Sequence, residues 1–154
     1  MARLFTSGFE LQDTTSGVEW DTYTATLSIN TDATYVRSGA ASLRAYFASN
    51  GTGSIANRFR ADGTATFWVR FYLLVHTRPA AQTTIFQYGD GSYNPILVKL
   101  NTTGKVSIWD DAGLIGAESD ALTADTWYRV EVSYNDTTNA TTLWLNGASV
   151  ATGG

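Results

Sequence analysis

Acidic side chains are the residues of this chain whose type and spacing could support catalysis. Hydrolysis of a glycosidic bond needs two carboxyl groups that flank the bond as acid/base and nucleophile. Three clusters bring carboxylates close together in sequence: Glu19-Trp20-Asp21, Asp110-Asp111 and Glu118-Ser119-Asp120. Glu19 and Asp21 would share one face of a strand, but the segment around them is polar and typical of a loop. The sequence therefore favours a solvated loop over a catalytic pair.

His76 is the one histidine of the chain, and there is no cysteine. A nucleophilic triad needs a base that is oriented by a carboxylate and lies beside a positioned Ser or Cys. The chain has no Cys and no Gly-x-Ser-x-Gly turn. One histidine without cysteine also cannot supply the usual ligands of zinc. We therefore interpret His76 as a residue at the end of a strand and expect no enzymatic activity.

The composition predicts a folded, all-β chain. At 154 residues the chain has the length of one domain and can bury a sizeable core. Hydrophobic residues make up 44% and aromatic residues 13%, which is typical of a globular protein. The strand formers Thr, Val, Tyr, Trp and Phe are frequent, whereas there are only two Lys. We expect a single all-β domain over residues 1–154.

Charge and hydropathy exclude several classes of partner. The formal net charge is −4 and the Arg residues are scattered, so no basic face for nucleic acid is expected. No apolar run is long enough to span a bilayer. The first ten residues also lack the long apolar core of a signal peptide. We expect synthesis in the cytoplasm without a visible signal peptide, and no membrane insertion.

The stretch from Thr126 to Gly147 shows the clearest structural pattern. Trp127 to Tyr134 alternates, with Tyr128, Val130, Val132 and Tyr134 on one face. A polar turn of Asn, Asp and Thr follows, and a second alternating strand then reaches Asn146-Gly147. Asn-Gly supplies the positive φ values of a type I′ turn. The stretch predicts a β-hairpin followed by a tight turn.

Further strands are predicted along the rest of the chain. Residues 67–75 are apolar and rich in aromatic and β-branched residues, which favours a central strand over a helix. Thr83–Tyr88 and Pro95–Leu100 form a predicted pair, and Lys105–Trp109 follows a Thr-Gly turn. About a dozen short strands at this spacing indicate a sandwich or a jelly roll.

Five short stretches follow one another along the chain: Phe67–Tyr72, Thr84–Phe86, Gly104–Trp109, Trp127–Val132 and Leu143–Gly147. In this order they resemble the laminin-G-like branch of the concanavalin A-like lectin/glucanase superfamily. In that family a Trp opens the strand after a long loop, and an Asn-Gly turn ends the next strand. The resemblance implies an antiparallel two-sheet jelly-roll sandwich. It identifies a fold and no activity.

Two departures from the family matter. The glucanases of the superfamily carry a Glu-x-Asp-x-(x)-Glu motif, which this chain lacks. Family members also continue past the Asn-Gly turn through one or two closing strands, whereas only Ala148–Gly154 follow here. A lost C-terminal part, a shorter module and a gap that another chain fills are all consistent with this. A missing closing strand would leave an open edge for assembly, and we predict that edge at Leu143, Trp144, Leu145 and Val150.

Calcium is the candidate cofactor. Modules similar to this family often bind Ca²⁺ through loop carboxylates and carbonyl oxygens, which suit a hard cation. The candidate ligands are Glu10 with Asp13, Asp90 in Gly-Asp-Gly, and Asp110 with Asp111. The alternative is that these are turn residues, because Asp side chains bond the local backbone. No stretch has the ligand density of an EF-hand loop.

Aromatic residues provide a candidate glycan site. Carbohydrate-binding modules stack sugar rings on Trp or Tyr beside hydrogen-bonding Asp and Asn. Trp109 with Asp110 and Asp111, and Tyr93 with Asn94, match this description. The alternative is that the aromatic residues fill the sandwich core, where they bury large areas.

Two functional classes follow from these observations. The first is a non-catalytic structural module on a virion surface, either capsid-decorating or tail-associated, that contacts protein partners through self-association or assembly on a capsid. The second is a glycan-binding module of a secreted or cell-surface protein. A glycoside hydrolase fragment comes third, because no acidic pair with the required spacing is present.

Overall fold

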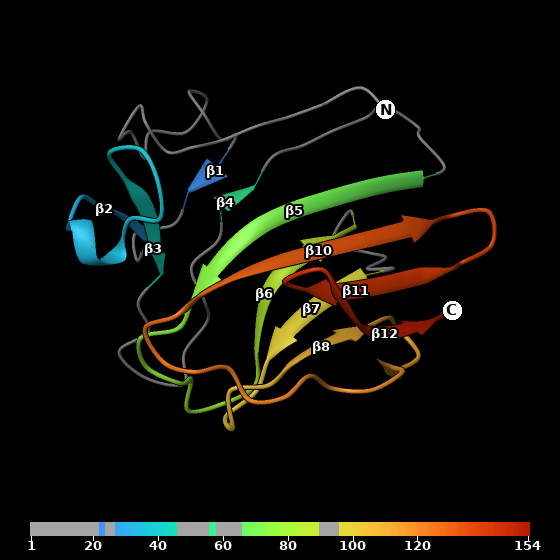
Figure 1. Ribbon diagram of the computed structural model, residues 1–154. Helices are drawn as coiled ribbons and strands as arrows, with labels where there is room; N and C mark the ends of the chain where they lie inside the picture. The colour runs from blue at the N-terminus through green and yellow to red at the C-terminus, as the bar shows by residue number, and fades with distance from the viewer. Residues whose placement is uncertain (1–21, 24–26, 46–55, 58–65, 90–95) are drawn as a thin grey trace. The chain divides into compact units, whose positions relative to one another are not determined.

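The computed structural model describes residues 22–23, 27–45, 56–57, 66–89 and 96–154 of the chain (Figure 1). These residues form strands, turns and one short 3₁₀ helix, and every strand pair among them is antiparallel. The all-β prediction is confirmed. The chain divides into two compact units, Met1–Asp62 and Gly63–Gly154, which are described separately. The prediction of a single domain over residues 1–154 stays a prediction.

The N-terminal unit contains two small antiparallel pairs among its described residues. One pair joins β1 (Thr22–Tyr23) to β4 (Ala56–Asn57), and the other joins β2 (Leu27–Asn30) to β3 (Ser42–Ala45). Between β2 and β3 lies the 3₁₀ helix η1 (Ala33–Tyr35). Asp32 caps this helix, because its Oδ1 accepts the backbone N–H of Thr34 at 2.9 Å. The helix is thus a capped turn between two paired strands.

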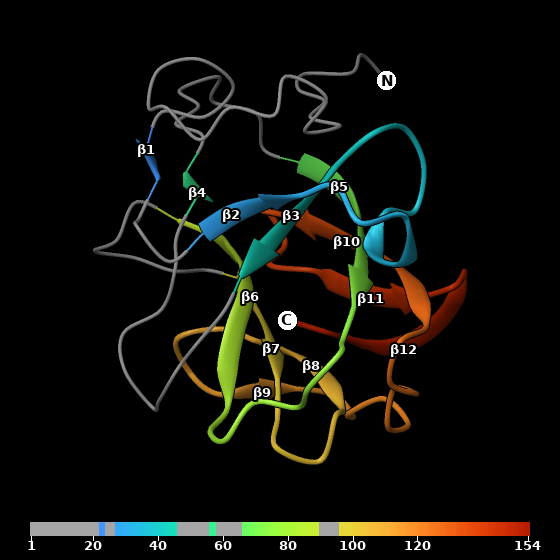
Figure 2. The same ribbon diagram turned by 90° about the vertical axis from the view of Figure 1, so that its left-hand side faces the viewer.

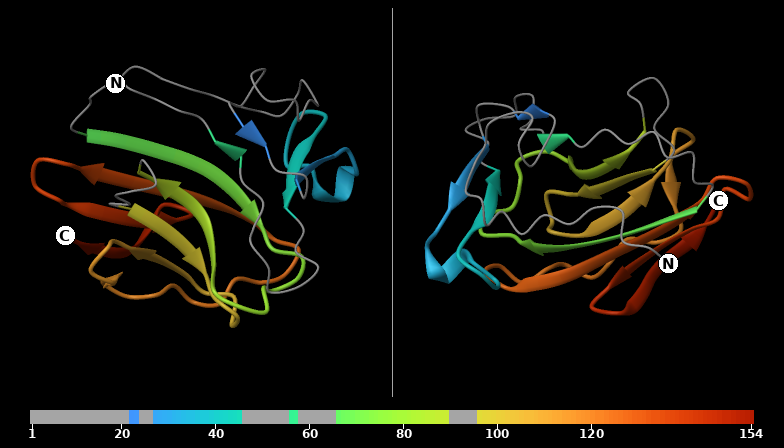
Figure 3. Two further views of the ribbon diagram at one scale, coloured as in Figure 1. Left: turned by 180° about the vertical axis from the view of Figure 1, so that it is seen from behind. Right: turned by 90° about the horizontal axis from the view of Figure 1, so that it is seen from above.

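The C-terminal unit is built from two four-stranded sheets. The first sheet has the order β12-β11-β10-β5 and consists of β5 (Thr66–Leu74), β10 (Trp127–Asn135), β11 (Thr141–Leu145) and β12 (Ala148–Gly153). The second has the order β6-β7-β8-β9 and consists of β6 (Thr83–Tyr88), β7 (Ile96–Leu100), β8 (Val106–Trp109) and β9 (Leu114–Ile115). Figure 2 and Figure 3 show the two sheets of this unit facing each other as a β-sandwich.

The predicted hairpin is present as β10 and β11. Tyr134 lies opposite Thr141, and Val130 lies opposite Leu145. Asn146 has φ 50° and Gly147 has φ 88°, as a type I′ turn requires. Both predictions, the hairpin and the tight turn, are confirmed.

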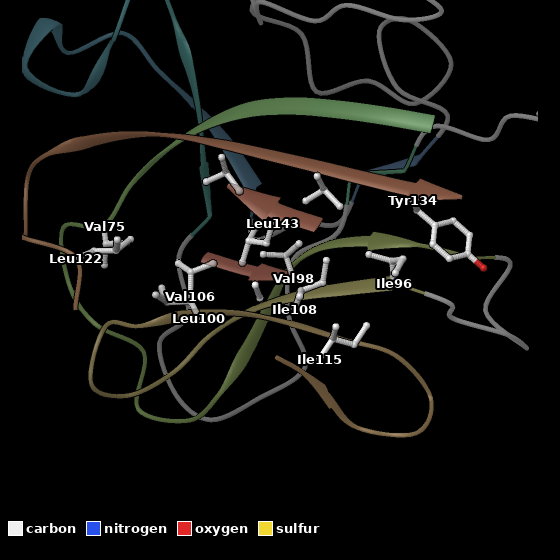
Figure 4. Close-up of a cluster of buried hydrophobic side chains, with 13 residues drawn as sticks. Val75, Ile96, Val98, Leu100, Val106, Ile108, Ile115, Leu122, Tyr134 and Leu143 are labelled. Carbon is white, nitrogen blue, oxygen red and sulfur yellow. The ribbon is translucent and has the colours of Figure 1, made fainter. Parts of the chain in front are cut away.

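The core lies between the inner faces of the two sheets. Val98, Ile108 and Leu143 have no exposed surface and lie between the sheets in Figure 4. Burial of each such side chain contributes about 1.5–3 kcal/mol of transfer free energy. The inner face of β5, which includes Phe67 and Val69, packs against this cluster. The alternation of the strands therefore places one apolar face of each sheet in the core.

The C-terminal residues form a strand that the sequence did not predict. Ala148–Gly153 form a strand, β12, that pairs with β11 after the Asn-Gly turn. Leu143, Trp144 and Leu145 therefore belong to an interior strand that is paired on both sides, and the prediction of an open edge at these three residues is wrong. Val150 lies in the last strand of the sheet, where the register with β11 shifts. Such a bulge discourages strand addition at an edge.

Candidate functional site

The surface of the first sheet that faces away from the core carries large aromatic and charged side chains. Alternation along β5 directs Phe67, Val69 and Phe71 to the core and therefore places the residues between them on the opposite side. We use the term outer face for the set Trp68, Arg70, Tyr72, Arg129, Glu131 and Trp144. Trp68 is 52% exposed and Tyr72 is 38% exposed. An exposed aromatic group on a sheet face is a more informative feature than a buried one.

Two indole rings stack across the outer face. The ring centroids of Trp68 and Trp144 lie 5.0 Å apart, with an angle of 19° between their planes. Trp68 lies opposite Ser133 and Trp144 lies opposite Glu131, so the two rings meet above β10, the strand that separates theirs. The small side chain of Ser133 leaves room for this contact. A ring pair of this kind contributes about 0.5–1.5 kcal/mol beyond its buried area.

Glu131 connects two arginines beside the indole stack. Arg70 Nε donates to Glu131 Oε1 at 2.9 Å, and Arg70 Nη2 lies 2.7 Å from the same oxygen. Arg129 Nε lies 2.9 Å from Glu131 Oε2 in an ion pair that lacks hydrogen-bond alignment. The Glu131 side chain is 15% exposed, whereas that of Arg70 is 59% exposed. The two arginines and one glutamate give the outer face a formal charge of +1.

The Asn146-Gly147 turn supports the backbone beneath this network. Asn146 Oδ1 accepts the backbone N–H of Arg129 at 2.9 Å, and the Asn146 N–H donates to the Arg129 carbonyl at 2.9 Å. A Cβ atom on Gly147 would lie 2.9 Å from Arg129 Nη2, so the guanidinium group packs directly over the glycine. The turn therefore positions both the backbone and the side chain of Arg129.

The predicted glycan site at Trp109 is occupied by contacts within the chain. Lys99 Nζ lies 4.1 Å from the centroid of the indole ring, in cation–π geometry. Trp109 Nε1 donates to Ser107 Oγ at 2.9 Å. Tyr93 and Asn94 lie outside the described residues. The indole thus already has partners on the sheet, and the glycan site stays a prediction.

Asp110 and Asp111 line a hollow at one end of the C-terminal unit, together with Tyr134, Asn139 and Gly154. Asp110 Oδ1 accepts the N–H groups of Ala112 and Gly113, both at 2.8 Å. Asp110 therefore has the turn role that is the alternative to calcium binding. Within the part of the chain that the structure describes, no three His, Cys, Asp or Glu side chains come together as a metal site. The other candidate ligands, Glu10, Asp13 and Asp90, lie outside that part.

His76 lies just beyond the end of β5, as expected from the sequence. Its Nδ1 is 2.6 Å from Asp125 Oδ1, and both side chains are more than half exposed, at 63% and 52%. The backbone N–H of Asp125 also donates to the Val75 carbonyl at 3.0 Å. This pair joins the end of β5 to the segment before β10, and it contains no nucleophile.

Sequence reasoning missed most of the outer face. Among its members only Trp144 was assigned to a site, and then as an edge residue. A signal was present in the alternation of residues 67–75, which places Phe67, Val69 and Phe71 on one face and Trp68, Arg70 and Tyr72 together on the other. The pairing of β5 with β10, which adds Arg129 and Glu131 to them, required the structure.

Comparisons with known proteins identify no relative. A scan against models of protein families, a search of curated proteins and a search of solved structures each found no match to this chain. The resemblance to the concanavalin A-like superfamily therefore remains a prediction. Among the described residues, no helix is long and apolar enough to cross a bilayer.

Proposed function

We propose that this chain is a non-catalytic assembly module that makes protein contacts through its outer face. The observation that carries the proposal is the composition of that face, with two Trp, one Tyr and two Arg on one side of a sheet. Trp, Tyr and Arg are the residues most enriched at the energetic centres of protein interfaces. In the sandwich the inner faces already supply the core, so these side chains are in excess of what folding needs.

The setting that we propose is a virion surface, with the chain decorating a capsid or attached to a tail. Its support is compositional: an all-β sandwich without cysteine needs no oxidising compartment to fold, and virions assemble in the reducing cytoplasm. The proposed fold is a concanavalin A-like jelly roll. Its support is the Trp-led strand β10 and the Asn-Gly turn after β11.

Glycan binding through the same face is the second candidate function. Trp68 offers an indole that is 52% exposed, and Arg70 offers exposed donors beside it. Sugar recognition uses an aromatic surface with a few placed polar groups. The ring stack favours the protein partner, because Trp68 and Trp144 cover one face of each other and so reduce the area available to a sugar ring.

One comparison separates the two functions. The native mass of the wild-type protein is measured by sedimentation velocity from micromolar to millimolar concentration, in parallel with a glycan array. The Trp68→Thr/Trp144→Thr variant removes the stack, and Thr84→Ala is the control, since it changes an exposed residue of β6 on the other sheet. Far-ultraviolet circular dichroism checks that each variant is folded.

We expect the wild-type protein and Thr84→Ala to associate with rising concentration, and the double variant to stay monomeric. A wild-type monomer whose glycan binding is lost in the double variant would replace the assembly function with the glycan function. A wild-type monomer that binds no glycan would refute both self-association and glycan binding through the outer face, and would leave only a capsid or tail protein as the proposed partner.

A further inference from the structure

The C-terminal unit carries opposite charges on two of its surfaces. The outer face has a formal charge of +1 from Arg70, Arg129 and Glu131. At one end of the sandwich, the turns at 110–113 and 136–140 carry Asp110, Asp111 and Asp136, with a formal charge of −3; we name this the acidic end. The two turns are neighbours, because the same hollow is lined by Asp110 and Asp111 from one and by Asn139 from the other. Charge separation of this kind favours contact between unlike surfaces.

The two surfaces also offer an exposed aromatic group on one side and a hollow on the other. Trp68 protrudes from the outer face with about half of its surface exposed, beside the exposed guanidinium group of Arg70. The acidic end is hollowed, and the hollow is lined by Ile115 and Tyr134 as well as by Asp110 and Asp111. An aromatic group with an adjacent cation fits a hollow that has an apolar floor and an acidic rim.

We propose that a second copy of this chain is the partner of the outer face, with Trp68 and Arg70 of one copy docking at the acidic end of the next. This inference rests on the proposed assembly function and names its partner. A symmetric contact of two outer faces would instead bring Arg70 and Arg129 against the same positive groups of the other copy, which is unfavourable. Because the two docking surfaces differ, the contact is head-to-tail and produces rings or filaments.

Complementation between two defective variants tests this arrangement. Arg70→Gln weakens the outer face, and Asp111→Asn/Asp136→Asn weakens the acidic end. Asp110 is left intact, because its Oδ1 holds the local turn. Asp136→Asn retains an oxygen that can accept from the Tyr134 hydroxyl, as Asp136 does at 3.1 Å. Asp120→Asn is the matched control. Asp120 precedes Ala121, which pairs with Lys105 just before β8, whereas Asp110 follows the other end of that strand.

Each defective variant alone should associate about tenfold more weakly than the wild-type protein, as expected when one partner of an interfacial charge pair is removed. A mixture of the two should form a 1:1 dimer, because each variant retains the surface that the other lacks. Raising the salt concentration should weaken this dimer, and Asp120→Asn should behave like the wild-type protein. Native mass spectrometry of an isotope-labelled mixture measures all of these species.

Two outcomes overturn the inference, and they differ in what they say of the assembly function. If the wild-type protein associates and the stack variant does not, but the mixture gives no heterodimer, the outer face has another partner surface and the assembly function stands. If the wild-type protein is monomeric at all concentrations, both the head-to-tail contact and the assembly of this chain with itself are refuted.

Discussion

The turn at Asn146 allows two contributions to stability to be separated by substitution. Asn146 adopts φ 50°, in the left-handed region, and its Oδ1 accepts the backbone N–H of Arg129 at 2.9 Å. The three substitutions Asn146→Asp, Asn146→Gly and Asn146→Ala remove these features in steps. Asp keeps the acceptor and tolerates the left-handed conformation. Gly keeps the conformation without the acceptor, and Ala keeps neither.

The expected losses follow from this geometry. A lost hydrogen bond costs about 0.5–1.5 kcal/mol, and the left-handed conformation costs a residue such as Ala about 1–2 kcal/mol. We therefore expect the free energy of unfolding to stay nearly unchanged in Asn146→Asp. It should fall by about 1 kcal/mol in Asn146→Gly and by about 2–3 kcal/mol in Asn146→Ala.

Urea unfolding followed by Trp fluorescence measures this series. The urea concentration at the unfolding midpoint should be highest for Asn146→Asp, lower for Asn146→Gly and lowest for Asn146→Ala. The slope of the free energy of unfolding against urea concentration should be the same for all three variants. If Asn146→Ala is as stable as Asn146→Gly, the left-handed conformation is not a constraint at this position. If Asn146→Gly matches the wild-type protein, the hydrogen bond to Arg129 contributes nothing, and the proposed support of the outer face by this turn is wrong.

Three further predictions concern the core, the ring stack and the N-terminal unit. Leu143→Ala should lower the free energy of unfolding by about 2–5 kcal/mol, because Leu143 is fully buried; a loss below 1 kcal/mol in urea unfolding would contradict this core. A double-mutant cycle of Trp68→Thr and Trp144→Thr should give a coupling of about 0.5–1.5 kcal/mol, and additive losses would show that the rings do not interact in solution. The backbone hydrogen bond from Thr34, with a further bond from its hydroxyl group, lowers the pKa of the Asp32 carboxyl. Asp32 should therefore stabilise its unit above the unfolded-state pKa and lose that effect as the pH falls through the folded-state pKa. A titration by nuclear magnetic resonance with its midpoint at the ordinary value would refute this.

Most of the strands could be predicted because burial of one face imposes a period of two on the sequence. Residues 67–75 were expected to be a strand, and Thr66–Leu74 form one, although the length and hydropathy of the predicted segment are also compatible with a helix. Asn146-Gly147 indicated its turn type directly, since few residues tolerate both φ values. Ala148–Gly153 were not recognised as a strand because Ala, Ser, Thr and Gly carry little apolar pattern. Their pairing with β11 forms a hairpin across the Asn146-Gly147 turn, so this turn was the local signal for the strand.

The candidate site was harder to predict, because it depends on which strands are neighbours. Trp68 and Trp144 are far apart in sequence and meet only because β10 lies between their strands. Arg70 and Glu131 likewise become a pair through the register of β5 on β10. In contrast, Trp109 was predicted as a glycan site because of its neighbours in sequence, Asp110 and Asp111. In the structure the Trp109 ring instead contacts Lys99 in cation–π geometry. Residues adjacent in sequence were therefore a poor guide to the residues that form a surface.

The outer face is informative because folding does not account for its composition. The inner faces of the sheets bury the valine, isoleucine and leucine side chains that stabilise the sandwich, and the solvated side of such a sheet needs only residues compatible with a strand. Ser133 and Thr142 meet that requirement on β10 and β11, whereas Trp68 and Tyr72 on β5 leave aromatic surface in contact with water. That exposure is unfavourable in an isolated molecule. A partner that covers the face would offset this cost, and the exposed aromatic residues are therefore the main support for the proposed assembly function.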